Sequence, residues 1–214
     1  MKLRAGVLTL AMLALMTSSA VAGNLYDNGP VNDNQAGWTI NFGFTVTDTI
    51  QVNGTVQGLD FWTLLIPGDT VTSVEVSIGS SPFGQNLFDG VMSVTQSDCF
   101  SDPFGFNLCH ESGSLSGPTL NGNYWLTLQN ASVPSGDPVY WNENSGNGCM
   151  SPGCPSMAQE NTLGTIPSEA FTVLGTAGTT TTSTSTGTTP EPGSIVLLGS
   201  GGLGIVGVLR RKLG

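Results

Sequence analysis

The sequence predicts an all-β fold, an antiparallel β-sandwich of jelly-roll type. Apolar and polar residues alternate with a period of two along residues 38–46 and 73–78, which is the pattern of strands with one buried face. Turn-forming residues separate the candidate strands, and no stretch between the termini keeps a helical period with caps. A sheet closed on itself is the alternative architecture.

The first strand is expected where Trp38, Ile40, Phe42, Phe44 and Val46 alternate with polar residues and would share the core face. The further strands are expected at residues 49–52, 56–66 (with an interruption near Gly58), 73–78, 90–96, 124–130, 139–141 and 171–174. Turns are expected at residues 67–69, 81–84, 121–122 and 134–137. The body of the protein is therefore assigned to residues 23–174, long enough for one domain with its own core.

Residues 1–22 have the order of features found in a secretory signal peptide. Lys2 and Arg4 precede an apolar stretch at residues 7–16, which is too short to span a bilayer. The cleavage site is assigned to Ala20, Ala22 and Gly23. The chain is therefore expected to be exported with Gly23 as its new N-terminus.

The C-terminal end predicts a linker followed by a membrane segment. Residues 175–189 consist almost entirely of Thr, Ser and Gly and predict a disordered stalk. Residues 194–209 are largely apolar and predict a short membrane helix of about 24 Å, at 1.5 Å per residue. Arg210, Arg211 and Lys212 follow it and favour a cytoplasmic C-terminus.

The triplet Pro190-Glu191-Pro192, the apolar segment and the basic end resemble a PEP-CTERM sorting signal, over residues 190–214 only. The resemblance implies export in a bacterium with an outer membrane and recognition by an exosortase-type membrane protease. It also implies transient residence in the inner membrane, removal of the tail, and association with the cell surface or an extracellular matrix of exopolysaccharide.

The charge distribution excludes some classes of partner. All five basic residues lie in the two terminal signals, whereas fourteen of the fifteen carboxylates lie in residues 23–189. Binding to a nucleic acid backbone requires Lys or Arg, and docking on anionic lipid requires a polybasic face. We therefore expect no nucleic acid partner, and the acidic surface is expected to keep the exported domain soluble.

Four cysteines in an oxidising compartment predict two disulfides, for which three connectivities exist. Spacing favours Cys99 with Cys109 and Cys149 with Cys154, each closing a short loop. A zinc site with His110 is disfavoured, because there is neither a Cys-x-x-Cys pair nor a second histidine.

The sequence favours a non-enzymatic protein. With one histidine and no Gly-x-Ser-x-Gly elbow, a serine or cysteine nucleophile has no evident base. The alternative is a carbohydrate-active enzyme of the two-carboxylate glycosidase type. Its candidate carboxylates are Asp60, Glu75, Glu111, Glu143, Glu160 and Glu169.

Contact with exopolysaccharide is the expected activity, because aromatic side chains offer the flat apolar faces on which sugars stack. Tyr140 and Trp141, next to a polar run, are the expected platform, although one member of an adjacent pair is expected to be core. No cofactor is expected other than a structural Ca²⁺. The oxygen ligands for it would come from Asp27, Asn28, Asn32, Asp33 and Asn34, which otherwise form turns.

Overall fold

The structure, a computed structural model, describes residues 22–31, 36–144 and 158–178. Within these residues the secondary structure consists of strands without a helix, and all strand pairs are antiparallel. The all-β antiparallel prediction is confirmed. The strands are β1 (Gly23–Asp27), β2 (Gly37–Thr39), β3 (Thr45–Leu65), β4 (Ser73–Gly79), β5 (Phe88–Ser93), β6 (Thr95–Ser101), β7 (Asn107–Ser114), β8 (Thr119–Ser132), β9 (Tyr140–Asn142), β10 (Ala158–Glu160), β11 (Gly164–Ile166) and β12 (Phe171–Ala177).

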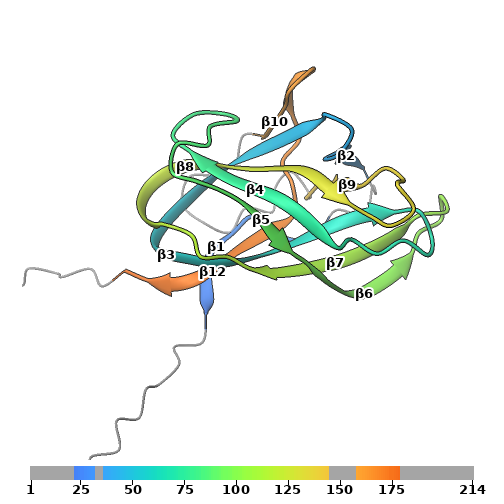
Figure 1. Ribbon diagram of the computed structural model, residues 1–214, viewed down its shortest axis with the longest axis horizontal. Coiled ribbons are helices and arrows are strands. Elements are labelled where there is room, and N and C mark those ends of the chain that lie inside the picture. Colours follow the sequence, from blue (N-terminus) through green and yellow to red (C-terminus); the bar gives the residue numbers. More distant parts are fainter. Residues whose placement is uncertain (1–21, 32–35, 145–157, 179–214) are drawn as a thin grey trace, which may run out of the picture. The chain divides into compact units, whose positions relative to one another are not determined.

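The long strand β3 connects the two parts of the fold. Its first half, residues 45–55, pairs with β8, and its second half, residues 58–65, pairs with β7. Figure 1 shows β3 bending sharply between these halves. Gly54 lies at the end of the first half with φ 154°, where a side chain would meet the backbone of Thr176 and Ala177. The two strands expected at residues 49–52 and 56–66 are therefore one strand.

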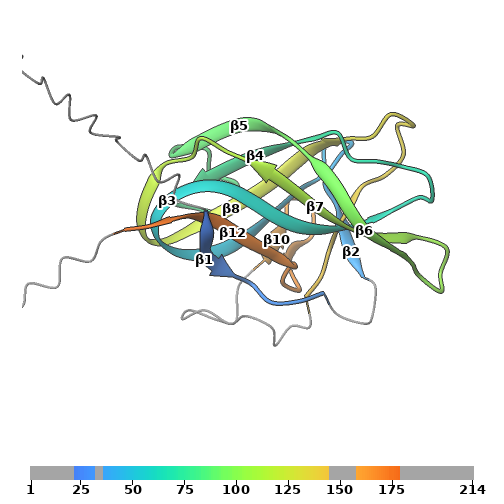
Figure 2. The same ribbon diagram turned by 90° about the horizontal axis from the view of Figure 1, so that it is seen from below.

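The remaining strands extend from these two halves. β8, β4 and β5 continue the sheet from the first half, while β6 pairs with β7 beside the second half. β12 and then β1 lie along the other edge of β3, and the short strands β9 and β10 pair with its two ends. Figure 2 shows β4 and β5 on the opposite side of β3 from β1 and β12.

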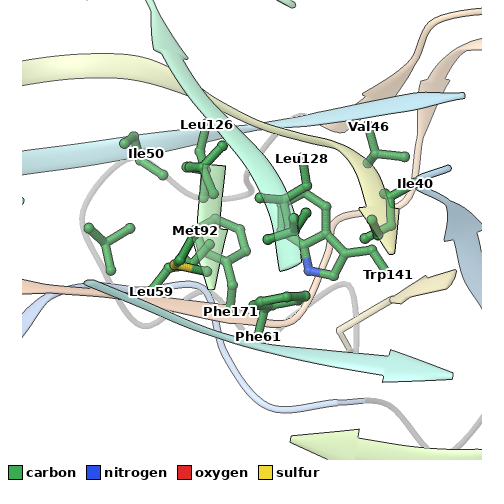
Figure 3. Packing of buried hydrophobic residues seen from close by; sticks show 14 of the residues in the cluster. Ile40, Val46, Ile50, Leu59, Phe61, Met92, Leu126, Leu128, Trp141 and Phe171 are labelled. Atoms are coloured by element: carbon green, nitrogen blue, oxygen red, sulfur yellow. The ribbon is translucent and has the colours of Figure 1, made fainter. Parts of the chain in front are cut away.

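The core lies between these groups of strands and draws on both. Leu126 and Leu128 of β8 and Phe61 of β3 are almost fully buried, as are Trp141 of β9 and Phe171 of β12. The labelled side chains in Figure 3 point toward one another across this space. The rings of Trp141 and Phe171 lie 5.4 Å apart. Burial of each such side chain stabilises the fold by roughly 1.5–3 kcal/mol, so this cluster holds the strand groups together.

The strand expected over residues 38–46 is interrupted, which corrects the prediction. Ile40 and Val46 are buried as expected, but Phe42 is 62% exposed and Phe44 39% exposed. Phe42 has a φ of 57°, and the amide of Phe44 donates to the carbonyl of Asn41, so the chain turns here. Asn41 stabilises this turn, because its side chain bonds the backbone of residues 137 and 139. Hydrogen bonds between residues distant in the sequence therefore determine the structure here, and the alternation of apolar and polar residues does not.

Further boundaries differ from the expectation, and residues 90–96 belong to two strands, β5 and β6, instead of one. Residues 121–122 lie inside β8, since pairing with β3 runs unbroken from Thr119 to Gln129 and Gly122 accommodates a φ of 136°. β12 continues to Ala177, and its last residues, Gly175 to Ala177, pair with β3. The ordered body thus extends three residues into the predicted stalk. The rest of that stalk lies outside the described residues.

Candidate functional site

Tyr140 and Trp141 of β9 have opposite environments. Trp141 is fully buried, stacks against Phe171, and donates its indole N–H to the carbonyl of Ala170 at 3.3 Å. Tyr140 is half-buried. The prediction that Trp141 contacts a glycan is wrong, because successive residues of a strand face opposite sides and this one faces the core. Tyr140 alone remains at the surface.

Tyr140 lines a pocket of about 370 Å³. The lining residues are Ala36, Gly37, Trp38, Leu64, Phe106, Tyr140 and Glu143. The rings of Phe106 and Tyr140 meet nearly at a right angle, 86°, with centroids 6.0 Å apart. Three aromatic side chains and one carboxylate thus share a concave surface, the usual composition of a small-molecule site. We call these seven residues the aromatic pocket.

Glu143 is the charged residue of the aromatic pocket. Its Oε1 accepts a hydrogen bond of 2.8 Å from Nε1 of Trp38, and its backbone N–H donates to the carbonyl of Ala36. The side chain is 8% exposed. The hydrogen bond from Trp38 fixes the position of this carboxylate at the pocket.

Gly37 lets β2 approach β9 closely enough to form the pocket. A Cβ atom at this position would lie 2.6 Å from the carbonyl oxygen of Trp141, a distance that side chains do not tolerate. β2 pairs with β9 from Gly37 opposite Asn142 to Thr39 opposite Tyr140. Trp38 thereby lies opposite Trp141, the neighbour of Tyr140 in β9. The sequence pattern placed Trp38 on a core-facing strand and did not indicate this role.

Phe106 was missed by the sequence reasoning. It lies at the end of the loop between β6 and β7, where its amide donates to Oδ1 of Asp102 at 2.8 Å. A disulfide between Cys99 and Cys109 joins the same two strands and confirms this predicted pair. The sequence feature that could have indicated Phe106 is its place in a short loop closed by the disulfide. A disulfide that closes such a loop stabilises the fold by about 2 to 3 kcal/mol.

The disulfide also removes Cys109 as a zinc ligand. His110, its neighbour in β7, stacks against Trp62 with ring centroids 5.0 Å apart, and its Nε2 lies 3.9 Å from Oδ2 of Asp60. His110 does not line the aromatic pocket. The second predicted pair, Cys149 with Cys154, lies outside the described residues.

The candidate carboxylates are dispersed over the described part of the molecule. Asp60 accepts from Ser112, and Glu75 accepts from Gln129 and Asn130. Burial acts to raise the pKa of Glu160, but hydrogen bonds from Thr162 and Leu163 outweigh this effect and lower the pKa. Among the six carboxylates proposed from the sequence, Glu143 lines the aromatic pocket and the other five do not.

Two of these carboxylates are fully buried. Burial raises the pKa of Glu111 to about 8, opposed by a hydrogen bond of 2.8 Å from Thr63. Burial, with Asp48 and Glu143 nearby, raises the pKa of Glu169 well above its usual range. Glu169 forms a β-bridge with Glu143 and thus lies next to the pocket residue in the sheet, but away from the pocket surface.

Asn28, one of the proposed Ca²⁺ ligands, lies in a buried polar network instead of a surface loop. Its side-chain amide donates to Oδ2 of Asp48 and to the carbonyl of Glu169, and its Oδ1 accepts from Tyr26. Asp27 accepts from the amide of Gly29 in a turn. In residues 22–31, 36–144 and 158–178, no three His, Cys, Asp or Glu side chains are grouped to hold a metal ion. Asn32, Asp33 and Asn34 lie outside these ranges, and a structural Ca²⁺ stays a prediction.

Most residues of the two targeting signals also lie outside the described residues. They include Ala20, the membrane segment at 194–209 and the sorting residues Pro190, Glu191, Pro192, Arg210, Arg211 and Lys212. Gly23, the predicted mature N-terminus, begins β1 opposite Gly175. Among the described residues, no helix long and apolar enough to cross a membrane is found.

Comparison with known families identifies the C-terminal signal. The model described as the PEP-CTERM protein-sorting motif matches residues 188–212. No curated protein and no solved structure matches the chain. The chain carries a PEP-CTERM sorting motif at its C-terminus, as exported substrates of exosortase do.

Proposed function

We propose that this exported, exosortase-sorted protein is a non-enzymatic component of the cell surface or extracellular matrix that contacts exopolysaccharide. The sorting motif at residues 188–212 supports the route, and the aromatic pocket supports the contact. The pocket is the observation that carries the proposal, because it combines stacking surfaces with one hydrogen-bonding carboxylate in a domain without basic residues.

The proposed route begins with removal of the signal peptide at residues 1–22. The segment at 194–209 then holds the chain in the inner membrane until exosortase cleaves near Pro190 to Pro192, and the stalk connects the released body to its anchor. Intact-mass measurement after cell fractionation tests this route. A mature form running from Gly23 to the Pro190–Pro192 region is expected, and a full-length chain in the cytoplasmic fraction would contradict it.

The proposed contact places the apolar face of a sugar ring against Tyr140, with Phe106 and Trp38 as the neighbouring walls. Aromatic rings offer large apolar faces at low entropic cost, which suits binding of a repeating polymer. Glu143 would accept hydrogen bonds from sugar hydroxyl groups. A single contact of this kind is expected to bind weakly.

A glycosidase remains the alternative, and one observation disfavours it. Two-carboxylate hydrolysis needs a pair of carboxyl groups facing the substrate, about 5 to 9.5 Å apart. Within the described lining of the pocket, Glu143 supplies one carboxylate, and the neighbouring Glu169 is fully buried. Release of reducing ends from exopolysaccharide, abolished by Glu143→Gln, would establish the enzyme instead.

Affinity electrophoresis of the mature protein in gels containing the producer's exopolysaccharide tests the contact. Tyr140→Ala is expected to weaken retardation roughly tenfold, the value of a lost stacking contact. Tyr124→Ala is the matched control, because Tyr124 is also half-buried but bonds its own strand at Asn121 and does not line the pocket. Equal retardation of wild type and Tyr140→Ala would contradict the proposed site.

We also propose that the fold is a β-sandwich of jelly-roll type. The division of β3 between two groups of strands, with one core drawn from both groups, supports this architecture. The contact of Gly113 in β7 with Met92 in β5 supports it further, because these strands belong to different groups and are not hydrogen-bonded to each other. An experimental structure of the mature domain tests the assignment.

A further inference from the structure

We propose that the aromatic pocket selects amino-sugar units that carry a free ammonium group, in preference to acetylated or acidic sugars. This inference rests on the proposed function, because it names the class of glycan that the same pocket takes. Three independent features of the described residues point to a cation: the aromatic walls, the fixed carboxylate, and the sign of the surrounding charge.

Three aromatic residues line the pocket. Phe106 and Tyr140 stand at 86° to each other with centroids 6.0 Å apart, and Trp38 belongs to the same lining. A cation within about 6 Å of an aromatic face is attracted by the quadrupole of the ring, most strongly by that of Trp. A neutral sugar would gain the stacking contact but not this electrostatic attraction.

Glu143 supplies a counter-charge at a defined place. The indole N–H of Trp38 holds its Oε1 at 2.8 Å, so the carboxylate does not need to be ordered when a ligand arrives. A charge-assisted hydrogen bond from an ammonium group to a carboxylate is about twice as strong as a neutral one. No side chain of the pocket lining is basic, so no internal cation competes for Glu143.

The charge of the whole domain acts in the same direction. Residues 23–189 contain fourteen carboxylates and no Lys or Arg. The resulting negative potential repels uronic acid polymers and attracts polycations, with an effect that salt screens. This general attraction of cations is not specific to the pocket. A test must therefore separate binding in the pocket from attraction by the net charge of the domain.

Binding is measured by titration calorimetry on the full mature protein, with glucosamine oligomers, fully N-acetylated oligomers of equal length, and uronate oligomers. We expect the glucosamine oligomers to bind at least about tenfold more tightly than the acetylated ones, and the uronate oligomers most weakly. Glu143→Gln should remove this preference while acetylated oligomers bind as before, because the amide oxygen still accepts from Trp38. Asp89→Asn is the matched control, since Asp89 is exposed on β5 outside the pocket and the change in net charge is the same.

The outcomes separate this inference from the proposed function. Equal binding of glucosamine and acetylated oligomers, with both lost in Tyr140→Ala, would overturn the selectivity and leave a neutral glycan site. Equal effects of Glu143→Gln and Asp89→Asn would overturn it in favour of general charge attraction. If none of the three oligomers nor the producer's exopolysaccharide bound, both the inference and the proposed function would fall.

Discussion

Asp48 and Glu111 are both completely buried carboxylates, yet the fold accommodates them in opposite ways. Asp48 in β3 accepts hydrogen bonds from Asn28, Ser168 and the backbone amides of Thr49 and Glu169. Glu111 in β7 accepts one, from Thr63, and its Oε2 has no hydrogen-bond partner. A buried charge needs compensation. Donors provide it at Asp48, whereas burial raises the pKa of Glu111 to about 8 and favours its neutral form.

The difference lies in the chain segments that each side chain meets. Residues 28, 168 and 169 approach Asp48 from distant parts of the sequence and bring polar groups to it. Glu111 lies opposite the buried core residue Phe61 in the neighbouring strand, and its side chain accepts from the buried Thr63. The fold therefore accommodates one buried carboxyl group with many hydrogen bonds and the other with a raised pKa.

Removing the Asp48 carboxylate should have the largest effect. Asp48→Ala removes the acceptor of hydrogen bonds from Asn28, Ser168 and two backbone amides in the interior and is expected to lower the free energy of unfolding by about 4 kcal/mol. Urea unfolding of the mature protein measures this loss. Asp89→Ala, at an exposed carboxylate, should change stability by less than about 0.5 kcal/mol. If Asp48→Ala changed the stability as little as Asp89→Ala does, the hydrogen bonds to Asp48 would not contribute to the stability of the fold.

The proton on Glu111 predicts the pH dependence of stability. Its pKa is about 8 in the folded protein and about 4.5 when unfolded. Between these values the unfolded state has lost the proton that the folded state keeps, so stability falls as pH rises from 4.5 to 8 and then levels off. Urea unfolding should show a loss of about 3 kcal/mol over this range from Glu111. Glu169, whose pKa is also raised by burial, adds a loss in the same direction. Stability that rises with pH over this interval would contradict the prediction.

Glu111→Gln should remove the contribution of Glu111 to this slope. The amide oxygen still accepts from Thr63, and no proton is lost at any pH. We expect the variant to match the wild type within about 1 kcal/mol near pH 4.5 and to be more stable by about 2 to 3 kcal/mol at pH 8. Unfolding curves at the two pH values measure the difference. A variant that is less stable than the wild type at pH 8 would indicate that Glu111 is ionised in the fold.

The smallest expected effects come from the two hydroxyl groups that donate to the buried carboxyl groups, those of Ser168 and Thr63. Ser168 donates to Asp48 at 2.9 Å and accepts from Asn144, whereas Thr63 donates to Glu111 at 2.8 Å. Because a hydrogen bond to a charged group is worth more, Ser168→Ala should cost about 2 kcal/mol and Thr63→Val about 1 kcal/mol at pH 7. Thermal unfolding of both variants gives the order. An equal cost would imply that the two carboxylates have the same charge.

The sequence predicted several features of the site and missed others for identifiable reasons. Tyr140 is half-buried and lines the pocket, whereas Trp141 is core, because contacts with residues 170 and 171 decide which face of β9 is buried. Phe106 joins the pocket through a hairpin whose tip lies next to Tyr140 only after folding. The sequence around Phe106 does not indicate that this residue lies next to Tyr140.

The sequence by itself determined the properties that depend on local pattern and covalent order. These are the antiparallel all-β class, the Cys99–Cys109 pair within one short loop, and the sorting motif at residues 188–212. Only the tertiary structure decided where strands break, as at Phe42, and how buried carboxyl groups are accommodated, as at Asp48 and Glu111. The physical reason is that backbone alternation acts between neighbouring residues, whereas burial and hydrogen bonding depend on segments as distant as residues 28 and 169.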